Sequence, residues 1–389
     1  MSMLKRFVAC AAIVAGVAGC AGQGATTPKI SGAQLTVYVS APTATASAQD
    51  ADVVAAEQLA FQRQSHTVSH FTVRLRVLHA SASDNARTAI QDSSAIAYIG
   101  ELVPGSSGGT IGITNAQDLL QVSPTDTALE LTRSTPVVPG APNTYYQSLS
   151  SNGRTFARVV PTSGAEARVQ AGELHALRVH KVYVANDGSP YGKAIAHALQ
   201  QDVGPPITAV EGPANGSRAS AAGADAVFFG GSSTSGATAL FDSVASSAPH
   251  AKLLAPSALY DQSFVQGLSS AARGQLYVSS PGFARRDEPA AARSEFVAPF
   301  VAAYHHQPAP QAIFGYEAVS AVLAALQHAG SAVNERNTVV RDFMNLHRSS
   351  SVLGSYSINR YGDPTIAPFI FAHVRSNTLQ PYRSEQQTE

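Results

Sequence analysis

The segment "HKVYVANDGSPYGKAIAHAL" (residues 180–199) contains a strand, a turn and a helix in immediate succession. Residues 180–186 alternate apolar and polar side chains, which predicts a strand, and residues 191–199 carry apolar side chains at helical spacing. The Asp-Gly-Ser-Pro turn between them places Tyr191 at the start of the helix. A strand that leads through a short turn into a helix is the repeating unit of a parallel α/β sheet.

The same alternation of strands and helices occurs in two series along the 389-residue chain. The first series has predicted strands at 34–40, 71–78, 95–102 and 119–124, and the second at 180–186, 206–212, 224–231, 251–257 and 274–280. A long helix at 315–330 and a hairpin around 361–363 follow. We therefore expect two parallel sheets. Ligands bind at the carboxyl ends of such strands, and two facing sheets form a cleft between them. Tyr191 could line the wall of this cleft, or it could be an ordinary packing residue at the start of a helix.

The N-terminus has the pattern of an export signal. Lys5 and Arg6 precede a short apolar run that ends in the small residues Val-Ala-Gly before Cys20. This ending resembles the lipobox of bacterial lipoproteins, in which the cysteine becomes the lipid-bearing first residue. The interpretation is a lipoprotein signal peptide over 1–19, lipidation at Cys20 and a tether over 20–33. An ordinary signal peptide with a chance cysteine is the alternative.

Composition excludes several classes of protein. The chain has 26 basic and 26 acidic residues, and 13% of its residues are charged, which argues against a nucleic-acid partner. Cys10 and Cys20 are the two cysteines, so a mature chain that starts at Cys20 has no pair to form a disulfide. No apolar run of spanning length follows Cys20. We expect an extracytoplasmic monomer whose membrane contact is the lipid.

Several segments, in order and spacing, resemble one known family. They are "AIAYIGELVPGSSGGTIGITNAQDLLQVSPTDTALELT" (95–132), "TFARVVPTSGAEARVQAGEL" (155–174), "DGSPYGKAIAHAL" (187–199), "ADAVFFGG" (224–231), "FGYEAVSAVLAALQHAG" (314–330) and "LGSYSINRYGD" (353–363). The family is that of the type I periplasmic binding proteins, specifically the branched-chain amino acid (Leu/Ile/Val) receptors of ABC importers. The resemblance extends over nearly all of residues 34–375.

The resemblance implies an α/β fold of two Rossmann-like lobes with parallel sheets, joined by a three-strand hinge that closes on a ligand. Residues 34–158 and 283–350 would form lobe 1, and residues 159–282 and 351–375 would form lobe 2. Residues 376–389 would be a C-terminal tail.

The resemblance also implies a set of ligand-binding residues. Thr127 matches the threonine that binds the ligand carboxylate, and Thr125 matches a position whose backbone N–H assists. Tyr191 matches the tyrosine after the turn of the second lobe. Ser232 follows the paired glycines that line the family's pocket, and Tyr316 lies at the start of a helix that approaches the cleft.

Two positions depart from the family's pattern. Pro104 stands where the family has a serine, and proline has no N–H to donate, so Ser106 or Ser107 would have to substitute. Ser257 stands where an acidic residue pairs with the ligand ammonium, and its loss removes a charge-assisted hydrogen bond. These departures favour a small polar or carboxylate-bearing solute, such as an amino acid or an amide.

The sequence supports an enzyme less well than a solute-binding protein. Residues 105–109 fit Gly-x-Ser-x-Gly, the motif of a hydrolase nucleophile, but two residues separate them from the preceding strand. A glycine-rich turn also serves to bind anions through backbone amides. His305 and His306 have no partner at metal-ligand spacing. His66 and His70 are four residues apart, but the segment between them is typical of a loop and not of a helix face. We expect no catalytic residue, no metal and no cofactor.

The sequence therefore predicts a lipid-anchored solute-binding protein that delivers a small ligand to an ABC permease. A lipoprotein of the same fold that contacts a partner enzyme of the cell wall, or a sensor subunit, is the alternative. An open polar cleft would favour the receptor, and a cleft filled by side chains would favour the partner module.

Overall fold

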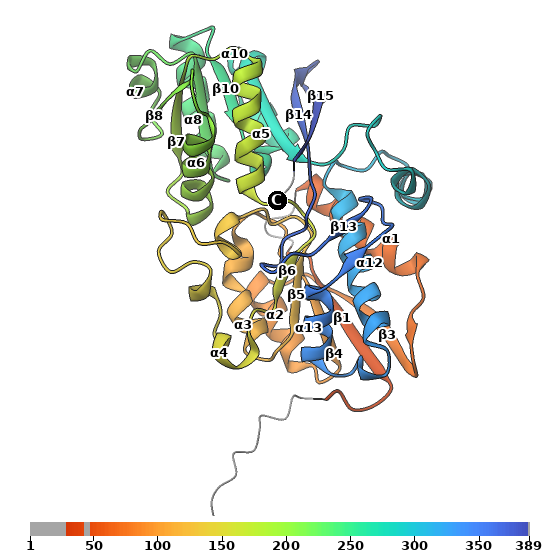
Figure 1. The fold of residues 1–389 in the computed structure, drawn as a ribbon. Coiled ribbons are helices and arrows are strands. Elements are labelled where there is room, and N and C mark those ends of the chain that lie inside the picture. The colour runs from red at the N-terminus through yellow and green to blue at the C-terminus, as the bar shows by residue number, and fades with distance from the viewer. Residues whose placement is uncertain (1–28, 43–46, 388–389) are drawn as a thin grey trace, which may run out of the picture.

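The computed structural model describes residues 29–42 and 47–387, so the predicted signal peptide, Cys20 and most of the tether lie outside the described residues. Two α/β lobes are stacked one above the other, each built on its own sheet (Figure 1). Most strand pairs in both sheets are parallel, which confirms the predicted fold class. Lobe 1 is the lower lobe in Figure 1, and lobe 2 is the upper one.

The sheet of lobe 1 has the order β2-β3-β1-β4-β5-β6. Its strands are β1 (Gln34–Ser40), β2 (Thr67–Val68), β3 (Phe71–Leu78), β4 (Ala95–Ile99), β5 (Leu120–Ser123) and β6 (Phe156–Arg158). Alternate side chains of β1 enter different cores, since Val37 and Val39 belong to one buried cluster and Tyr38 to another. The helices of the first cluster are α1 (Ala48–Arg63), α12 (Ala312–Ala329) and α13 (Arg336–Met344). The second cluster is covered by α2 (Ala82–Gln91), with α3 (Ile111–Asn115) nearby.

The sheet of lobe 2 has the order β15-β14-β11-β10-β9-β7-β8. Its strands are β7 (Lys181–Asn186), β8 (Thr208–Glu211), β9 (Ala226–Gly230), β10 (Lys252–Ala255), β11 (Leu276–Pro281), β14 (Ala367–Arg375) and β15 (Thr378–Gln387). One face is covered by α5 (Ser163–Ala176) and α6 (Pro190–Asp202). The other is covered by α7 (Gly216–Ala221), α8 (Thr234–Ser247), α9 (Gln262–Gly267) and α10 (Ser270–Gln275).

Short elements complete the chain. They are α4 (Leu149–Asn152), a π-helical turn (Ala292–Val297) that continues into α11 (Ala298–Tyr304), and the small sheet of β12 (His347–Arg348) and β13 (Tyr356–Ser357).

The chain passes between the lobes after β6, after β11 and before β14. Arg158 ends β6 at the first of these crossings, and its side chain is fully buried. Its Nε lies 3.1 Å from Asp363 Oδ1, and its terminal nitrogens donate to the carbonyl oxygens of Asp126 (2.6 Å) and Ala128 (2.9 Å). The backbone N–H of Arg158 donates to the carbonyl of Gly362 at 2.8 Å. A buried ion pair therefore ties the first crossing to the last.

The C-terminal part of the chain differs from the sequence-based expectation. Residues 378–387, expected as a tail, form β15, which pairs antiparallel with β14. The expected hairpin around 361–363 is limited to a bridge between Ile358 and Pro364, because β14 pairs with β11 and β15 instead. β14 is buried over its first six residues, so its backbone N–H and C=O groups need hydrogen-bond partners, which β11 and β15 supply.

Part of the segment expected in lobe 2 packs in lobe 1. Four apolar residues between the last helix and β14 belong to the core of lobe 1: Val352, Leu353, Tyr356 and Ile358. They are in the same buried cluster as α12 and α13. The apolar side chains of this segment therefore bind it to the lobe from which it departs, and the crossing into lobe 2 comes after residue 358.

The two lobes are in apolar contact. A buried cluster combines Ile111, Ala128 and Leu131 of lobe 1 with Tyr191 and Ile195 of lobe 2. Each of these side chains is at most 2% exposed. The lobes are thus closed against each other beside α6, and opening them there would expose apolar surface.

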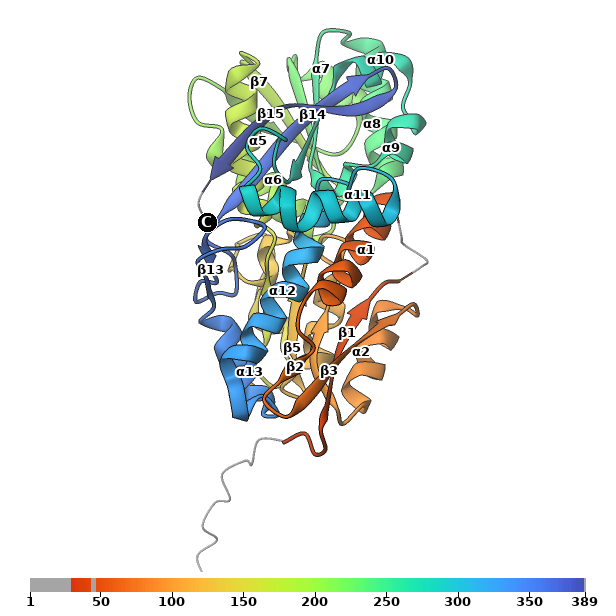
Figure 2. The same cartoon turned by 90° about the vertical axis from the view of Figure 1, so that its right-hand side faces the viewer.

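Gly315 allows the closest helix contact in lobe 1. Helices α1 and α12 lie side by side (Figure 2), and a Cβ at Gly315 would collide with the carbonyl oxygen of Val53. We expect Gly315→Ala to lower the free energy of unfolding by about 1–3 kcal/mol, because backbone must move to admit the methyl group. Urea unfolding monitored by circular dichroism measures this loss.

The matched control is Gly267→Ala at the end of α9, where a Cβ would meet nothing within 4 Å. This control is expected to be neutral or to stabilise by up to about 1 kcal/mol, since alanine is the better helix residue. Equal urea midpoints for the two variants would contradict the close contact.

Candidate functional site

An open cleft with a volume of about 610 Å³ lies between the lobes. Lobe 1 lines it with residues 47–50, 102–104 and 311, and lobe 2 with residues 232, 234, 257, 258 and 260–263. Pro104 follows β4, Ser232 follows β9 and Ser257 follows β10, so the cleft lies at the carboxyl ends of both parallel sheets. This is where open α/β sheets bind ligands, and the volume is typical of a small-molecule site.

Polar side chains on both walls could bind a solute. Gln311 and Asp50 approach from lobe 1, and Ser232, Ser257 and Asp261 approach from lobe 2. The backbone N–H of Ser232 donates to Asp187 at 3.0 Å, which holds the loop after β9 in place. Of the predicted ligand-binding residues, Ser232 and Ser257 are the two that line this cleft.

Tyr191 lies between the lobes behind the open cleft and is 2% exposed. Its hydroxyl has no hydrogen-bond partner among the described residues, and neither has the fully buried hydroxyl of Thr127. Burial and the charge of Glu166 raise the pKa of Tyr191 well above its usual value, and the nearby hydroxyls of Thr127 and Ser257 oppose this rise. The structure thus brings Thr127, Tyr191 and Ser257 together from both lobes.

Ser257 connects this hydroxyl cluster to the cleft and is held by a buried carboxyl group. Its backbone N–H and its hydroxyl both donate to Glu166, at 2.6 and 2.9 Å, and the hydroxyl of Ser279 donates to the same carboxyl at 2.6 Å. Burial raises the pKa of Glu166 to about 7, although these donors favour the ionised form. Ser257 therefore presents mainly acceptor capacity to the cleft, because both of its donors are used.

The glycine-rich turn after β4 binds an internal carboxylate. Asp126 is fully buried and accepts the backbone N–H groups of Gly105 at 2.6 Å and Ser107 at 2.9 Å. The hydroxyl of Ser107 accepts the N–H of Glu101 at 3.1 Å, and the hydroxyl of Ser106 donates to the Val103 carbonyl. Neither serine lines the cleft in this arrangement.

Thr125 and Tyr316 also make their contacts with other residues of the protein. Thr125 is 2% exposed, and its hydroxyl donates to the Leu102 carbonyl at 2.8 Å. Tyr316 packs on Phe296, with 5.5 Å between ring centroids, and lines a separate hollow of about 360 Å³. Tyr316 does not line the cleft in this arrangement, because it lies on the face of α12 that enters the core of lobe 1. Gln311, just before the same helix, reaches the cleft instead.

Sequence analysis missed Asp50, Asp261 and Gln311. Asp50 is the third residue of α1 and forms a capping box with Ser47, and Asp261 caps α9. Their sequence signal is that of helix caps, which occur in most helices without any ligand. What distinguishes these two capping residues is that both line the same cleft, and this depends on how the chain folds and not on local sequence.

The described residues offer neither a metal site nor a membrane-spanning helix. Over residues 29–42 and 47–387, no three His, Cys, Asp or Glu side chains are grouped so that they could hold a metal ion. Among the helices of the same residues, none has the length and apolar character needed to cross a membrane. The site as described consists of hydroxyl, amide and carboxylate groups, which bind and orient a solute by hydrogen bonds.

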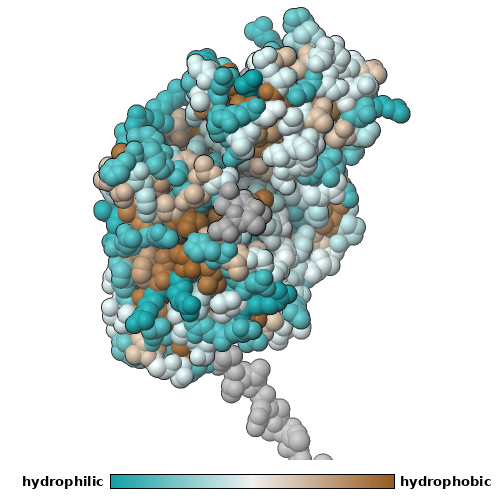
Figure 3. All heavy atoms as spheres, turned by 180° about the vertical axis from the view of Figure 1, so that it is seen from behind, coloured by the Kyte–Doolittle hydropathy of each residue, from teal (hydrophilic) through white to brown (hydrophobic). Residues whose placement is uncertain are grey.

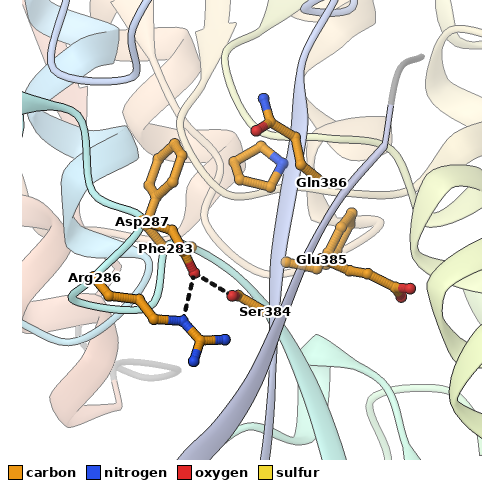
Figure 4. A pocket seen from close by; sticks show the side chains of 9 residues that line it. Phe283, Arg286, Asp287, Ser384, Glu385 and Gln386 are labelled. Carbon is orange, nitrogen blue, oxygen red and sulfur yellow. Dashed lines mark hydrogen bonds and ion pairs between the residues drawn. The ribbon is translucent and has the colours of Figure 1, made fainter. Parts of the chain in front are cut away.

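A further hollow, of about 330 Å³, lies beside the hinge where the chain leaves β11 (Figure 4). Phe283, Arg286 and Asp287 line it from the crossing segment, and Ser384 lines it from β15. The hydroxyl of Ser384 donates to Asp287, and Asp287 forms an ion pair with Arg286 at 3.3 Å. This contact ties the C-terminal strand to the second crossing.

Viewed from behind, both lobes are largely hydrophilic, with a hydrophobic area on the lower lobe (Figure 3).

Comparisons with known proteins agree with the geometry. The sequence matches the periplasmic binding protein family over residues 79–378. A leucine-binding protein from Thermotoga maritima has a similar structure, with 18% identity, a TM-score of 0.74 and coverage of 90% of this chain and 98% of that chain. A branched-chain amino acid transporter substrate-binding protein from Streptococcus pneumoniae, in complex with isoleucine, is 14% identical with a TM-score of 0.70, covering 92% and 100%.

A third similar structure binds a different kind of molecule. It is a solute-binding protein of an ABC transporter from R. palustris in complex with benzoate, 16% identical with a TM-score of 0.67, covering 92% of this chain and 97% of that chain. A search of curated protein sequences found no match.

The chain belongs to the periplasmic binding protein family, because the matched segment spans well over half of its length. Its two-lobed fold is that of the type I members, which include receptors for branched-chain amino acids. The structural relatives share too few residues to show more than the fold.

Proposed function

We propose that this protein is a lipid-anchored, extracytoplasmic solute-binding protein of an ABC importer, and not an enzyme. The open polar cleft at the carboxyl ends of both sheets is the observation that carries the proposal. Its walls come from both lobes, so a ligand between them would contact both at once. A ligand with that property stabilises the closed arrangement by its differential affinity for it.

The proposed cycle assigns a role to each part of the chain. Hinge motion at the three crossings opens the cleft, a small polar solute binds between Gln311 of lobe 1 and Ser232 of lobe 2, and the lobes close. The closed form, a monomer, then docks onto a membrane permease. Residues 1–19 direct export, Cys20 carries the lipid and residues 20–33 form the tether. Residues 34–158 and 283–350 mainly form lobe 1, and residues 159–282 mainly form lobe 2.

The test is a thermal-shift screen over amino acids, amides and short carboxylates, because a bound ligand raises the apparent stability by mass action. We expect Thr127→Trp to abolish the stabilisation by any solute that stabilises the parent protein. The indole would fill the space at the hydroxyl cluster between the lobes. Thr127→Val, which removes the hydroxyl and keeps the shape, is expected to weaken the stabilisation without eliminating it.

Thr88→Trp is the matched control, since Thr88 is an exposed residue of α2. Circular dichroism of each variant without solute shows whether it is folded. Full ligand-induced stabilisation of both Thr127 variants would remove Thr127 from the site, and no stabilisation of the parent protein by any solute of the screen would count against a receptor.

One observation favours the alternative of a partner-binding or sensor module without transport. The lobes share a buried apolar cluster around Tyr191, so the part of the interlobe space behind the cleft is filled by side chains. A module of this kind would keep the lobes closed with or without a solute. Small-angle scattering distinguishes the two functions, because a receptor becomes more compact when the ligand is added and a permanently closed module does not.

A further inference from the structure

We propose that the cleft selects an organic cation that lacks a carboxylate group. This inference rests on the proposed function and specifies the chemical class of its ligand. It is carried by two carboxylates that face each other from the two lobes, and by an internal carboxylate that occupies the amides an anionic group would need.

The two cleft carboxylates belong to Asp50 and Asp261. Asp50 lies in the first turn of α1 on lobe 1, and Asp261 precedes α9 on lobe 2, so the cleft separates them. Both line the same cleft, and the pKa of Asp50 is raised by burial first and also by the charge of Asp261. Two like charges on opposite walls repel each other and so oppose closure of the lobes. A cation bound between them attracts both carboxylates and so favours closure.

Each carboxylate has an oxygen available for a ligand. Asp50 Oδ2 accepts from the backbone and the hydroxyl of Ser47, both at 2.9 Å, and Asp261 Oδ1 accepts the N–H groups of Ser263 and Phe264. In the part of the chain that the structure describes, no hydrogen bond involves Asp50 Oδ1 or Asp261 Oδ2. Among the described residues, the caps thus use one oxygen of each group, and the other oxygen can accept an N–H donor of a ligand.

No positive charge balances the pair within the cleft. Among the described residues that line the cleft there is no lysine, arginine or histidine. The buried Arg158 is bound to Asp363 and to backbone carbonyls, and so is not available to a ligand anion. Glu130, buried nearby, also has its pKa raised to about 7, by burial first and then by the charge of Asp126.

Three donor groups near the cleft that could bind a ligand carboxylate are already occupied by internal carboxylates. Asp126 accepts the N–H groups of Gly105 and Ser107, and Pro104 has none to offer. Glu166 accepts both donors of Ser257. The hydroxyls of Thr127 and Tyr191, which lie behind the cleft, can accept as well as donate, so they are compatible with an ammonium group. An ammonium would therefore find acceptors on both walls, whereas a carboxylate would face other carboxylates.

Three probes with one carbon skeleton test this inference. Leucinamide carries a cation alone, leucine carries a cation and a carboxylate, and 4-methylpentanoate carries a carboxylate alone. We expect leucinamide at saturation to raise the Tm of the parent protein by roughly 5–10 °C, and the two carboxylates to have little effect. Isothermal titration calorimetry then gives the Kd for leucinamide.

The variants Asp261→Asn and Asp50→Asn keep a capping oxygen and remove the charge. Each is expected to weaken leucinamide binding at least tenfold, because a charge-assisted hydrogen bond is lost. Asp84→Asn, an exposed carboxylate at the start of α2, is the control and should leave the Kd unchanged. Two positions are tested so that a folding defect in one variant does not decide the result.

The outcomes separate the inference from the proposed function. Stabilisation by leucine or 4-methylpentanoate and not by leucinamide would overturn the cation preference and leave the receptor function standing. Leucinamide binding that both cleft variants retain would overturn the assigned carboxylates. An absence of any shift with leucinamide would overturn the cation preference, while the receptor function would then be decided by the wider solute screen.

Discussion

Replacement of Arg158 by methionine is expected to lower the free energy of unfolding by about 3–5 kcal/mol. The guanidinium is fully buried, pairs with Asp363 and donates to the carbonyls of Asp126 and Ala128. Methionine fills much of the same volume but leaves the buried carboxylate of Asp363 with Arg133 as its remaining cation, at 2.9 Å and partly exposed. Urea unfolding followed by circular dichroism measures the loss.

Arg87→Met is the matched control for this prediction. Arg87 pairs with Asp84 at 3.2 Å on the surface of α2, where both side chains are more than half exposed. A surface ion pair contributes little, so we expect a change of less than about 1 kcal/mol. Similar losses in the two variants would show that burial of the Arg158 pair does not determine its contribution.

The second large effect is expected from pH at Glu166. Burial raises its pKa in the folded protein from 4.5 to about 7, so the folded state keeps a proton that the unfolded chain has lost. Stability from this group is complete below pH 4.5 and falls as pH rises through 7. At 1.36 kcal/mol per pKa unit, the fall amounts to about 3 kcal/mol.

Glu166→Gln should remove this dependence, because glutamine has the shape of a protonated glutamate. We expect the variant to match the parent protein near pH 4.5 and to be more stable by about 3 kcal/mol near pH 8. Glu211→Gln, at an exposed residue of β8, is the control. Chemical unfolding at both pH values gives the difference, and a parallel pH profile for the Glu166 variant and the parent protein would contradict the prediction.

The strands and their parallel arrangement could be predicted from the sequence because burial leaves a direct pattern. The run at 34–40 is β1 residue for residue, and the alternation at 71–78 is β3. β15 could not be predicted in this way. Its sequence, "TLQPYRSEQQ", is mostly polar because it lies at the edge of the sheet, so its pairing depends on β14 and not on a pattern of its own.

The candidate site was predictable to a smaller extent. Ser232 and Ser257 could be placed at the cleft by the resemblance to the family, and the structure has both after strands that end at the cleft. Tyr316 could not be excluded from it, because which face of α12 enters the core depends on packing against α1 and the π-helical turn. Asp50 and Asp261 carry an ordinary capping signal, and only the folded chain shows that both open into one space.

The position of β15 also affects how this protein behaves beside other molecules. An edge strand has unpaired backbone groups to which a strand of another chain could bind, and such pairing leads to aggregation. β15 carries Pro381, Arg383 and Glu385, and its register shifts opposite Phe371 and Ala372. Proline, charge and an irregular register are the features by which natural edge strands resist such pairing. β15 therefore disfavours the addition of a strand from another molecule at this edge of the lobe 2 sheet.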